Sequence, residues 1–358
     1  MAKKNIDKRV RILTFLFYFI YPVHALYSMT MWKDILFAAS MLIFTILLTE
    51  LSVSNNIFKS KINLFFLILS MIFVILFRNN GIYIVILTFP FLFLFLRNEY
   101  KKIIFISCCI LAFYGIWKGP VFSVFHIQEG AIGEALSIPL QQFARISKYH
   151  SDTLTNEEKA NIQKYFLVDN IGEKYYPELS DDVKGQLNAK AFQEDKIGFL
   201  KLYFELFFEY PKTTLEAFLA NNYGYWYPEA TNWIVFKEIS EPAEEDWQAL
   251  NIRTSPIFFN PLVDNFIKII GMKNIPILSM LFRIGFAFWL VLILITYTIY
   301  QKQYNYLLIY IPILALWLTC LSSPAFCEFR YMYSLFTCLP IYLGVHFICH
   351  ENKKKDKD

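Results

Sequence analysis

Charged residues are scarce in this chain of 358 residues, of which only 18% are Asp, Glu, Lys or Arg. Soluble domains contain about 25% of these residues, so the low charge excludes an ordinary soluble globule. Glycine and proline are also few, at 12 and 14 residues, which excludes a collagen-like or linker-like chain. The net charge of +4 is too small for a nucleic-acid-binding surface, and we expect no nucleic-acid partner.

Cysteine and histidine are rare as well, with six and five residues that lie scattered along the chain. Their spacing matches neither a disulfide framework nor a CxxC metal site. The HExxH, GxSxG and Walker motifs are absent from the sequence. Zinc chemistry, hydrolysis by a serine triad and ATP binding are therefore not expected.

Apolar residues are abundant, at 56% of the chain, and the mean hydropathy is +0.39. They are concentrated in runs of 15 to 26 residues, close to the length that crosses a bilayer core. Only helices satisfy such a backbone in lipid. We therefore predict an all-α polytopic membrane protein with about eight transmembrane helices. The expected spans are Ile12–Met31, Ile35–Val53, Ile62–Phe77, Ile82–Leu96, Ile103–Trp117, Ile275–Tyr300, Tyr304–Leu321 and Tyr331–Ile348.

Lys and Arg residues are unevenly distributed among the segments between these spans. If the N-terminus is cytoplasmic, 15 of them lie in inner segments, whereas the short outer turns hold only Lys33, Arg78 and Arg330. This asymmetry satisfies the positive-inside rule. We predict a multi-pass protein of the cell membrane with its N- and C-termini in the cytoplasm.

Four regions follow from this topology. We expect an N-terminal membrane region with five spans (1–117), an extracytoplasmic loop domain (118–274), a C-terminal membrane region with three spans (275–350) and a cytoplasmic basic tail (351–358). The loop domain has 15 basic and 22 acidic residues, which makes it acidic.

The loop domain is predicted to be mainly helical. The sequence LTNEEKANI predicts a capping box between Thr155 and Glu158. Residues 195–222 read as aromatic amphipathic helices broken at Pro211. Their apolar side, which includes Phe199 and Phe208, either lies on the bilayer surface or packs in the core of the loop domain.

Polar residues at the ends of the spans are the first candidates for function, because a charge at apolar depth is costly. Lys33 and Asp34 open the second span. The Asp34 carboxylate would bind a divalent cation or take a proton from an attacking hydroxyl, and the alternative is an ordinary interfacial ion pair. Arg78, Asn79 and Asn80 lie in a turn that suits a phosphate oxygen, or in a plain turn with a snorkelling arginine.

Three further groups lie near the loop domain. Gln142 and Arg145 share one side of a predicted helix that follows the fifth span and form a polar face over the membrane mouth, unless this is simply a solvated face. Glu328 and Arg330 are two residues apart, so they do not stack on one helix face and we expect at least one to point inward. The aromatic run Tyr225, Trp226 and Tyr227 would stack on a sugar or lipid, or anchor the chain at the interface.

Six stretches in order resemble the landmarks of a known group of sequences. They are KDILF after YPVHALYSM, then RNNGIY, SIPLQQFAR, LTNEEKANI, GYWYP and EFRYMY. Together they resemble an uncharacterised family of bacterial polytopic membrane proteins regarded as glycosyltransferases with the GT-C architecture. Such enzymes transfer a sugar from a polyprenyl-phosphate carrier in the lipid bilayer to a lipid, protein or glycan acceptor.

The resemblance implies roles for individual residues. Asp34 matches the second acidic position of these enzymes, which is associated with a metal or with the acceptor, so Asp34 is a catalytic and metal-binding candidate for a divalent cation such as Mg or Mn. Arg78 and Arg330 would bind phosphate, and Gln142 and Arg145 would cover the carrier. Glu328 is the second catalytic candidate. The expected substrate-binding residues are Lys33, Arg78, Asn79, Asn80, Gln142, Arg145, Tyr225, Trp226, Tyr227, Arg330 and Tyr331.

One departure from the family pattern affects the expected activity. The principal catalytic acid of GT-C enzymes lies between their first two spans, and this chain resembles them from the third span onward. We therefore expect an inactive remnant, a start codon placed too late, or a shortened enzyme whose missing hairpin comes from a partner subunit. A transporter or flippase for lipid-linked oligosaccharides, a surface polysaccharide polymerase and a non-enzymatic scaffold remain alternatives, although spans with little charge at mid-depth argue against transport.

Overall fold

The structure is a computed structural model, and it describes residues 7–28, 30–53, 55–128, 130–234, 268, 275–322 and 327–355. Several sequence predictions concern other residues. Part of the predicted loop domain (235–267 and 269–274) and the last three residues of the basic tail (356–358) lie outside the described residues. The same holds for Lys3 and Lys4, which entered the prediction of topology.

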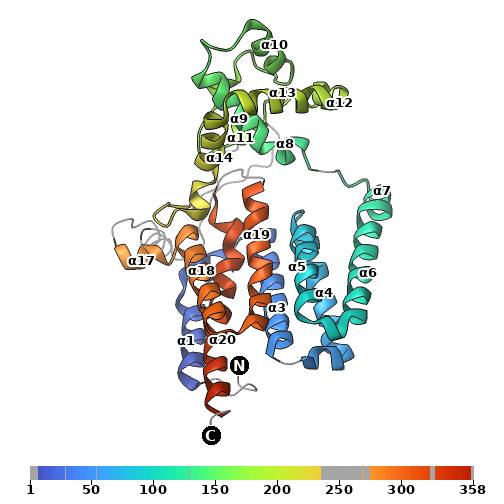
Figure 1. The fold of residues 1–358 in the computed structure, drawn as a ribbon, viewed down its shortest axis with the longest axis vertical. Coiled ribbons are helices and arrows are strands. Elements are labelled where there is room, and N and C mark those ends of the chain that lie inside the picture. The colour runs from blue at the N-terminus through green and yellow to red at the C-terminus, as the bar shows by residue number, and fades with distance from the viewer. Residues whose placement is uncertain are drawn as a thin grey trace, which may run out of the picture.

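The described chain forms a bundle of apolar helices with a smaller helical domain at one end (Figure 1). Isolated bridges are the only β-structure in this part of the chain. In the bundle, α1 begins and α20 ends at the end that faces away from the smaller domain. Its helices are α1 (Lys8–Ile20), α2 (Pro22–Ser28), α3 (Lys33–Val53), α4 (Lys61–Phe77), α5 (Gly81–Phe95), α6 (Tyr100–Ile116), α7 (Phe122–Val124), α17 (Pro276–Met280), α18 (Ile284–Tyr300), α19 (Ile311–Ser322) and α20 (Tyr333–Lys355).

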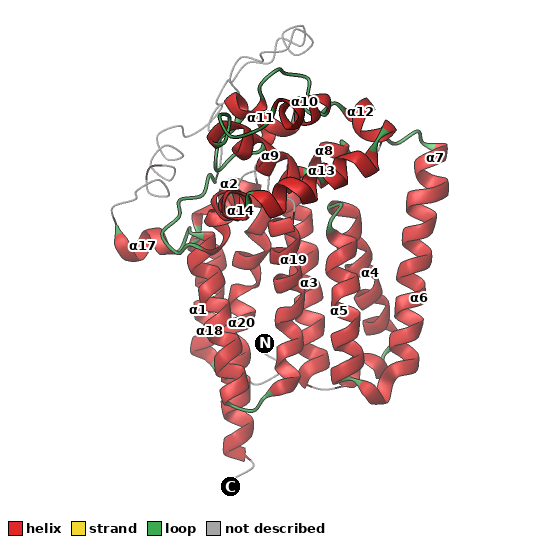
Figure 2. Ribbon diagram, turned by 45° about the horizontal axis from the view of Figure 1, so that its top comes forward, coloured by secondary structure: helices red, strands yellow, loops and turns green. Residues whose placement is uncertain are grey.

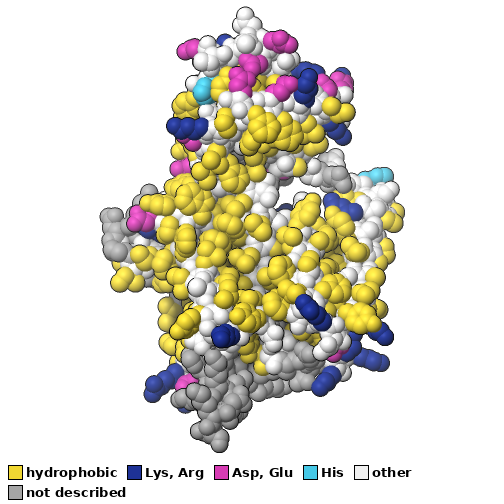
Figure 3. Space-filling view, viewed as in Figure 1, with side chains coloured by type: hydrophobic (Ala, Val, Ile, Leu, Met, Phe, Trp, Pro, Cys, Tyr) yellow, Lys and Arg dark blue, Asp and Glu magenta, His cyan; other side chains and the backbone are white. Residues whose placement is uncertain are grey.

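Helices therefore occupy all the segments predicted as spans. Three of them, Lys33–Val53, Arg97–Val124 and Tyr304–Ser322, are long and apolar enough to cross a membrane, and the bent pair α1 and α2 makes a fourth. The apolar helices α4, α5 and α18 are shorter. Exposed apolar side chains cover much of the bundle surface in Figure 3, as expected of a membrane protein.

Three predicted spans differ from the helices observed. The first bends by 50° at Tyr21, where Pro22 lacks the N–H that would continue the helix. The fifth continues past Trp117 to Val124, so the boundary expected at residue 117 falls inside a helix. The sixth, predicted as one run, is interrupted between Met280 and Ile284. The amide of Ile284 donates to the Asn232 side chain (3.0 Å) where α18 begins.

The bundle core consists of large apolar side chains from distant parts of the chain. α3 packs against α4 and α20, and α5 packs against α19. Phe37, Phe44, Phe329 and Phe336 are fully buried in this core. The rings of Phe329 and Phe336 stack with their centroids 4.2 Å apart.

The smaller domain consists of residues 130–234, which are part of the predicted loop domain (118–274), and from here on the name loop domain refers to residues 130–234 alone. The predicted capping box is confirmed, since Thr155 and Glu158 exchange hydrogen bonds at the start of α10. The predicted break at Pro211 is also confirmed. Its helices are α8 (Ile132–Ala135), α9 (Ser137–Tyr149), α10 (Asn156–Lys164), α11 (Asp181–Lys184), α12 (Ala189–Glu194), α13 (Lys196–Glu209) and α14 (Pro211–Trp226).

Helix α13 divides its aromatic residues between two sides. Phe199 is fully buried beside Phe143, with ring centroids 5.4 Å apart, as the core-packing interpretation predicted. Phe204 and Phe208 are 52% and 74% exposed, so they lie outside that core. Figure 3 shows apolar side chains on the part of the loop domain nearest the bundle and most of its acidic side chains farther away.

Helix α14 joins the loop domain to the bundle. The carbonyl oxygens of Tyr225 and Trp226 accept hydrogen bonds from Trp317 (3.1 Å) and Trp289 (2.8 Å). Gly285 of α18 lies directly against the backbone of Tyr227, where an added Cβ would come within 2.2 Å of the carbonyl oxygen. Only glycine permits this approach. The glycine at position 285 therefore allows α18 to lie directly against the end of α14.

Candidate functional site

A cavity of about 430 Å³ lies where the bundle meets the loop domain, and we call it the junction cavity. It collects residues from the ends of α3, α4, α5 and α19, from the turn before α20, and from α8 and α14. Eight of the predicted substrate-binding and catalytic residues meet here although they are far apart in sequence. The lining residues are Lys33, Asp34, Arg78, Asn79, Asn80, Glu134, Tyr225, Thr319, Cys320, Arg330 and Tyr331.

Asp34 and Arg78 form the charged centre of this cavity. Asp34 is only 4% exposed, and its Oδ1 lies 3.6 Å from Nε of Arg78. This oxygen has no hydrogen-bond partner among the described residues. A buried carboxylate needs a nearby cation, and here Arg78 is that cation, whereas the neighbouring Lys33 is exposed. The carboxylate keeps an acceptor position for a ligand.

Two arginines share the aromatic ring of Tyr331. The guanidinium carbons of Arg78 and Arg330 each lie 5.0 Å from the ring centroid, within the range of cation–π attraction. Arg78 also donates to the Tyr331 carbonyl (2.9 Å), and Arg330 donates to the Tyr331 hydroxyl (3.2 Å). Tyr331 therefore fixes the direction of both guanidinium groups.

Glu328 holds Arg330 from the other side. Their side chains form an ion pair, and the backbone of the same turn is held because Phe329 donates its N–H to the Trp233 carbonyl (2.9 Å). Burial raises the pKa of the Glu328 carboxyl above its usual range, although Arg330 opposes this. The expectation that one of the pair points inward is met by Arg330, which lines the cavity, whereas Glu328 does not.

Uncharged groups complete the walls. Asn80 donates to the Thr319 hydroxyl across 2.7 Å, which ties the start of α5 to α19. Tyr225 is fully buried, and Asn79 is exposed at the rim. The cavity thus combines cations, one buried carboxylate and hydrogen-bonding groups next to an apolar bundle, which suits a ligand with a phosphate and a polar head.

Comparison with known sequences identifies the family. A model described as a family of unknown function (DUF6020) matches residues 1–358. The chain belongs to this family. No curated protein and no solved structure matches the chain. The role of the junction cavity in this DUF6020 member therefore rests on its geometry.

Four predicted substrate-binding residues lie away from the junction cavity of this DUF6020 protein. Gln142 is buried in the loop domain, where it donates to the Thr214 carbonyl (3.0 Å). Arg145 donates to the Glu216 carboxylate (2.5 Å) and the Tyr175 hydroxyl (2.9 Å). Their shared helical side, predicted as a polar face over the membrane, instead packs against α14 and the segment around residue 175. Trp226 and Tyr227 also do not line the cavity.

Sequence reasoning missed three lining residues. Glu134 begins the polar stretch that follows the fifth span. That stretch did indicate a site, but the residues predicted from it were Gln142 and Arg145. Thr319 and Cys320 lie within an apolar run, where nothing in the local sequence distinguishes them from packing residues.

The predicted divalent cation stays a prediction. Asp34 is the one buried carboxylate of the cavity, and Arg78 lies beside it. In the described part of the chain, no cluster of three or more His, Cys, Asp or Glu side chains could hold a metal ion. Mg²⁺ is usually bound by one or two carboxylates together with phosphate oxygens, but the positive charge of Arg78 beside Asp34 repels a cation, so no step is assigned to a metal.

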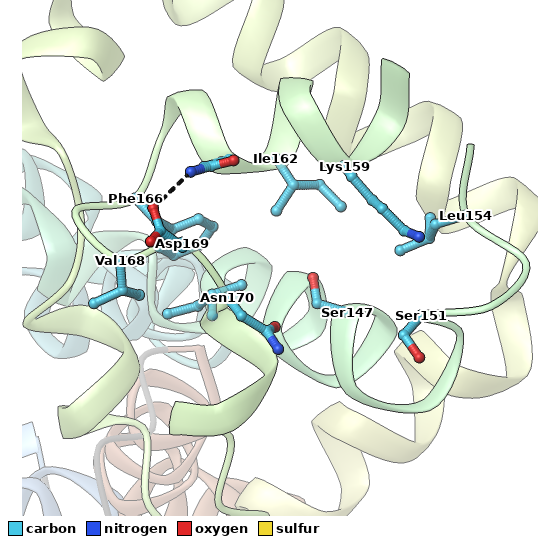
Figure 4. A pocket seen from close by; sticks show the side chains of 11 residues that line it. Ser147, Ser151, Leu154, Lys159, Ile162, Phe166, Val168, Asp169 and Asn170 are labelled. Carbon is cyan, nitrogen blue, oxygen red and sulfur yellow. Dashed lines mark hydrogen bonds between the residues drawn. The ribbon is translucent and has the colours of Figure 1, made fainter. Parts of the chain in front are cut away.

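A second cavity, of about 350 Å³, lies within the loop domain and contains none of the predicted residues (Figure 4). Its floor is apolar and includes Ile162 and Phe166. At its rim, Gln163 donates to the Asp169 carboxylate across 3.0 Å. Because this cavity is lined by none of the predicted residues and by no buried polar side chain, the candidate site is the junction cavity.

Proposed function

We propose that this protein is an integral membrane glycosyltransferase of GT-C type, which transfers a sugar from a polyprenyl-phosphate carrier to an extracytoplasmic glycan or lipid acceptor. In this proposal eight helices span the cell membrane, both termini are cytoplasmic, and the loop domain lies outside. The observation that carries the proposal is that the paired Asp34 and Arg78 line a cavity together with Arg330 at the end of an apolar bundle.

The two arginines would bind the carrier phosphate. A guanidinium group offers paired N–H donors that match phosphate oxygens, and it keeps its charge at all physiological pH values. Both groups are oriented in advance by Tyr331, so they lose little freedom when the phosphate binds. The exposed Lys33 at the rim adds a third positive charge.

The reaction would be an inverting displacement. The acceptor oxygen forms a bond to the anomeric carbon while the bond from that carbon to the phosphate oxygen breaks, and the phosphate keeps the electron pair. Arg78 and Arg330 stabilise the negative charge that develops on this leaving group. The acceptor proton moves to Asp34, whose buried Oδ1 has an open acceptor position. Glu328 acts as a positioning residue because it contacts Arg330 and does not line the cavity.

Gene deletion followed by complementation tests the proposal. The sugar composition of the cell envelope should change on deletion and return with the wild-type gene, but not with Asp34→Asn. Glu50→Gln, at the far end of the same helix, should restore it and serves as the matched control. An envelope composition that is identical in the wild-type, deletion and Asp34→Asn strains contradicts the proposal.

Reconstituted protein separates the other functions. Transfer of one labelled sugar to an acceptor supports a glycosyltransferase, and growth of a long chain supports a polymerase. Movement of a labelled lipid-linked oligosaccharide across the vesicle membrane without transfer supports a flippase.

A further inference from the structure

Glu134 brings a second carboxylate into the junction cavity from the loop domain. It lies on α8, which is placed over the end of α5 in Figure 1. The segment before α8 passes close to the turn after α4, since a Cβ added to Gly130 would lie 3.9 Å from Nδ2 of Asn79. The loop domain therefore contributes a charged side chain to the site as well as covering it.

A buried lysine holds this carboxylate in place. Nζ of Lys184 lies 2.9 Å from Glu134 and 2.7 Å from Asp181. Burial lowers the pKa of Lys184, but the bonds to Asp181 and Glu134 outweigh it and raise the pKa above its usual range. The lysine stays charged as a result. Glu134 itself keeps a side chain that is 60% exposed, so its carboxylate remains accessible to a ligand.

The packing of α8 on α11 makes this arrangement rigid. A Cβ added to Gly133 would lie 3.2 Å from the carbonyl oxygen of Lys184, so the two short helices are in close contact. A carboxylate held in this way is ordered before any ligand binds, which lowers the entropic cost of binding.

The charges of the cavity then set the direction of a bound ligand. A phosphate is attracted to Arg78 and Arg330 and repelled by the carboxylate of Glu134, whereas a hydroxyl group donates a hydrogen bond to a carboxylate. We propose that Glu134 binds the hydroxyl groups of the sugar of a lipid-phosphate-linked sugar whose phosphate contacts Arg78 and Arg330. This inference rests on the function proposed above and names the residue that distinguishes the sugar-bearing carrier from the bare one.

Binding to two kinds of short-chain probe tests this inference on the full-length protein in nanodiscs. One probe is farnesyl phosphate, and the others are farnesyl phosphates that carry glucose, galactose, mannose or N-acetylglucosamine. Glu134→Gln should weaken the best sugar-bearing probe about 10- to 100-fold, the loss expected for a hydrogen bond to a charged group, and leave the Kd of farnesyl phosphate within about twofold.

Asp182→Asn is the matched control, because it removes an exposed carboxylate of the same helix α11 that does not line the cavity. It should leave both Kd values unchanged. If Glu134→Gln weakens both probes equally, or neither, or if wild-type protein binds no sugar-bearing probe more tightly than farnesyl phosphate, the inference is wrong. If wild-type protein binds none of the probes, the proposed function fails with it. Failure of Arg78→Gln to weaken farnesyl phosphate contradicts the phosphate site and, with it, the orientation inferred for the carrier.

Discussion

The helix bundle and the loop domain satisfy their polar groups in different ways. In the bundle, many Ser and Thr hydroxyls bond the preceding turn of their own helix, as Ser40 does with Leu36 and Thr88 with Ile84. In the loop domain, several buried polar side chains bond other elements, as Gln141 does with Tyr176 and Gln142 with Thr214. The bundle is therefore held together chiefly by apolar packing, and the loop domain also needs specific long-range hydrogen bonds. Charged groups are brought together where these two regions meet.

The largest effect is expected at that meeting point. Arg78→Ala leaves the buried Asp34 without its cation, which we expect to cost about 3–5 kcal/mol of stability. The melting temperature of the purified protein in detergent measures this loss. Arg97→Ala, at an exposed position, should cost less than about 0.5 kcal/mol. Equal melting temperatures for the two variants would show that the ion pair does not stabilise the junction.

A smaller effect is expected where helix α18 contacts the loop domain. Gly285→Val forces a side chain against the Tyr227 backbone, and overpacking of this kind costs about 1–3 kcal/mol. We expect faster proteolysis between the loop domain and α18. Gly115→Val is the control, since an added Cβ there meets nothing within 4 Å. Proteolysis at the same rate in both variants would contradict a tight junction.

The loop domain should depend on Gln142 for stability and not for binding. Gln142→Ala removes the hydrogen bond to Thr214 and should cost about 1–2 kcal/mol, with unchanged affinity for farnesyl phosphate. Gln163→Ala, at an exposed position, provides the comparison. A loss of affinity without a loss of stability would restore the earlier view of Gln142 as a substrate-binding residue.

The smallest effect is expected at the capping box of α10. Thr155→Ala should cost about 1 kcal/mol, seen as faster amide exchange in α10. Hydrogen bonds from the Thr155 backbone and hydroxyl lower the pKa of Glu158. The stabilisation from Glu158 is thus present above the pKa of the unfolded chain and is lost as pH falls through the lower folded value. Protection factors in wild-type α10, which correct for the slower intrinsic exchange in acid, should fall as the pH is lowered; protection factors that stay constant would contradict this role.

The sequence was sufficient to predict those features that depend on residues close together in the chain. Apolar runs predicted the helices of the bundle, and the spacing of Thr155 and Glu158 predicted a cap that is present. The sequence was insufficient to predict contacts between segments that are far apart in the chain. Nothing near Arg78 indicates that it bonds Tyr331, 253 residues away, and nothing near Asn232 indicates that it caps α18. The polar groups of the site were predicted as separate clusters, and only folding shows which helix ends meet.

The backbone contact at Gly285 also bears on how a reactant reaches the cavity. A cover on a hinge admits its ligand by tilting away, but here a tilt would have to pull the Tyr227 carbonyl from the surface of α18. Entry between the helix ends, parallel to the plane of a lipid layer, needs no such separation. Under the proposed function, this contact would favour a lipid-linked carrier that arrives by two-dimensional diffusion, for which the bilayer itself shortens the search.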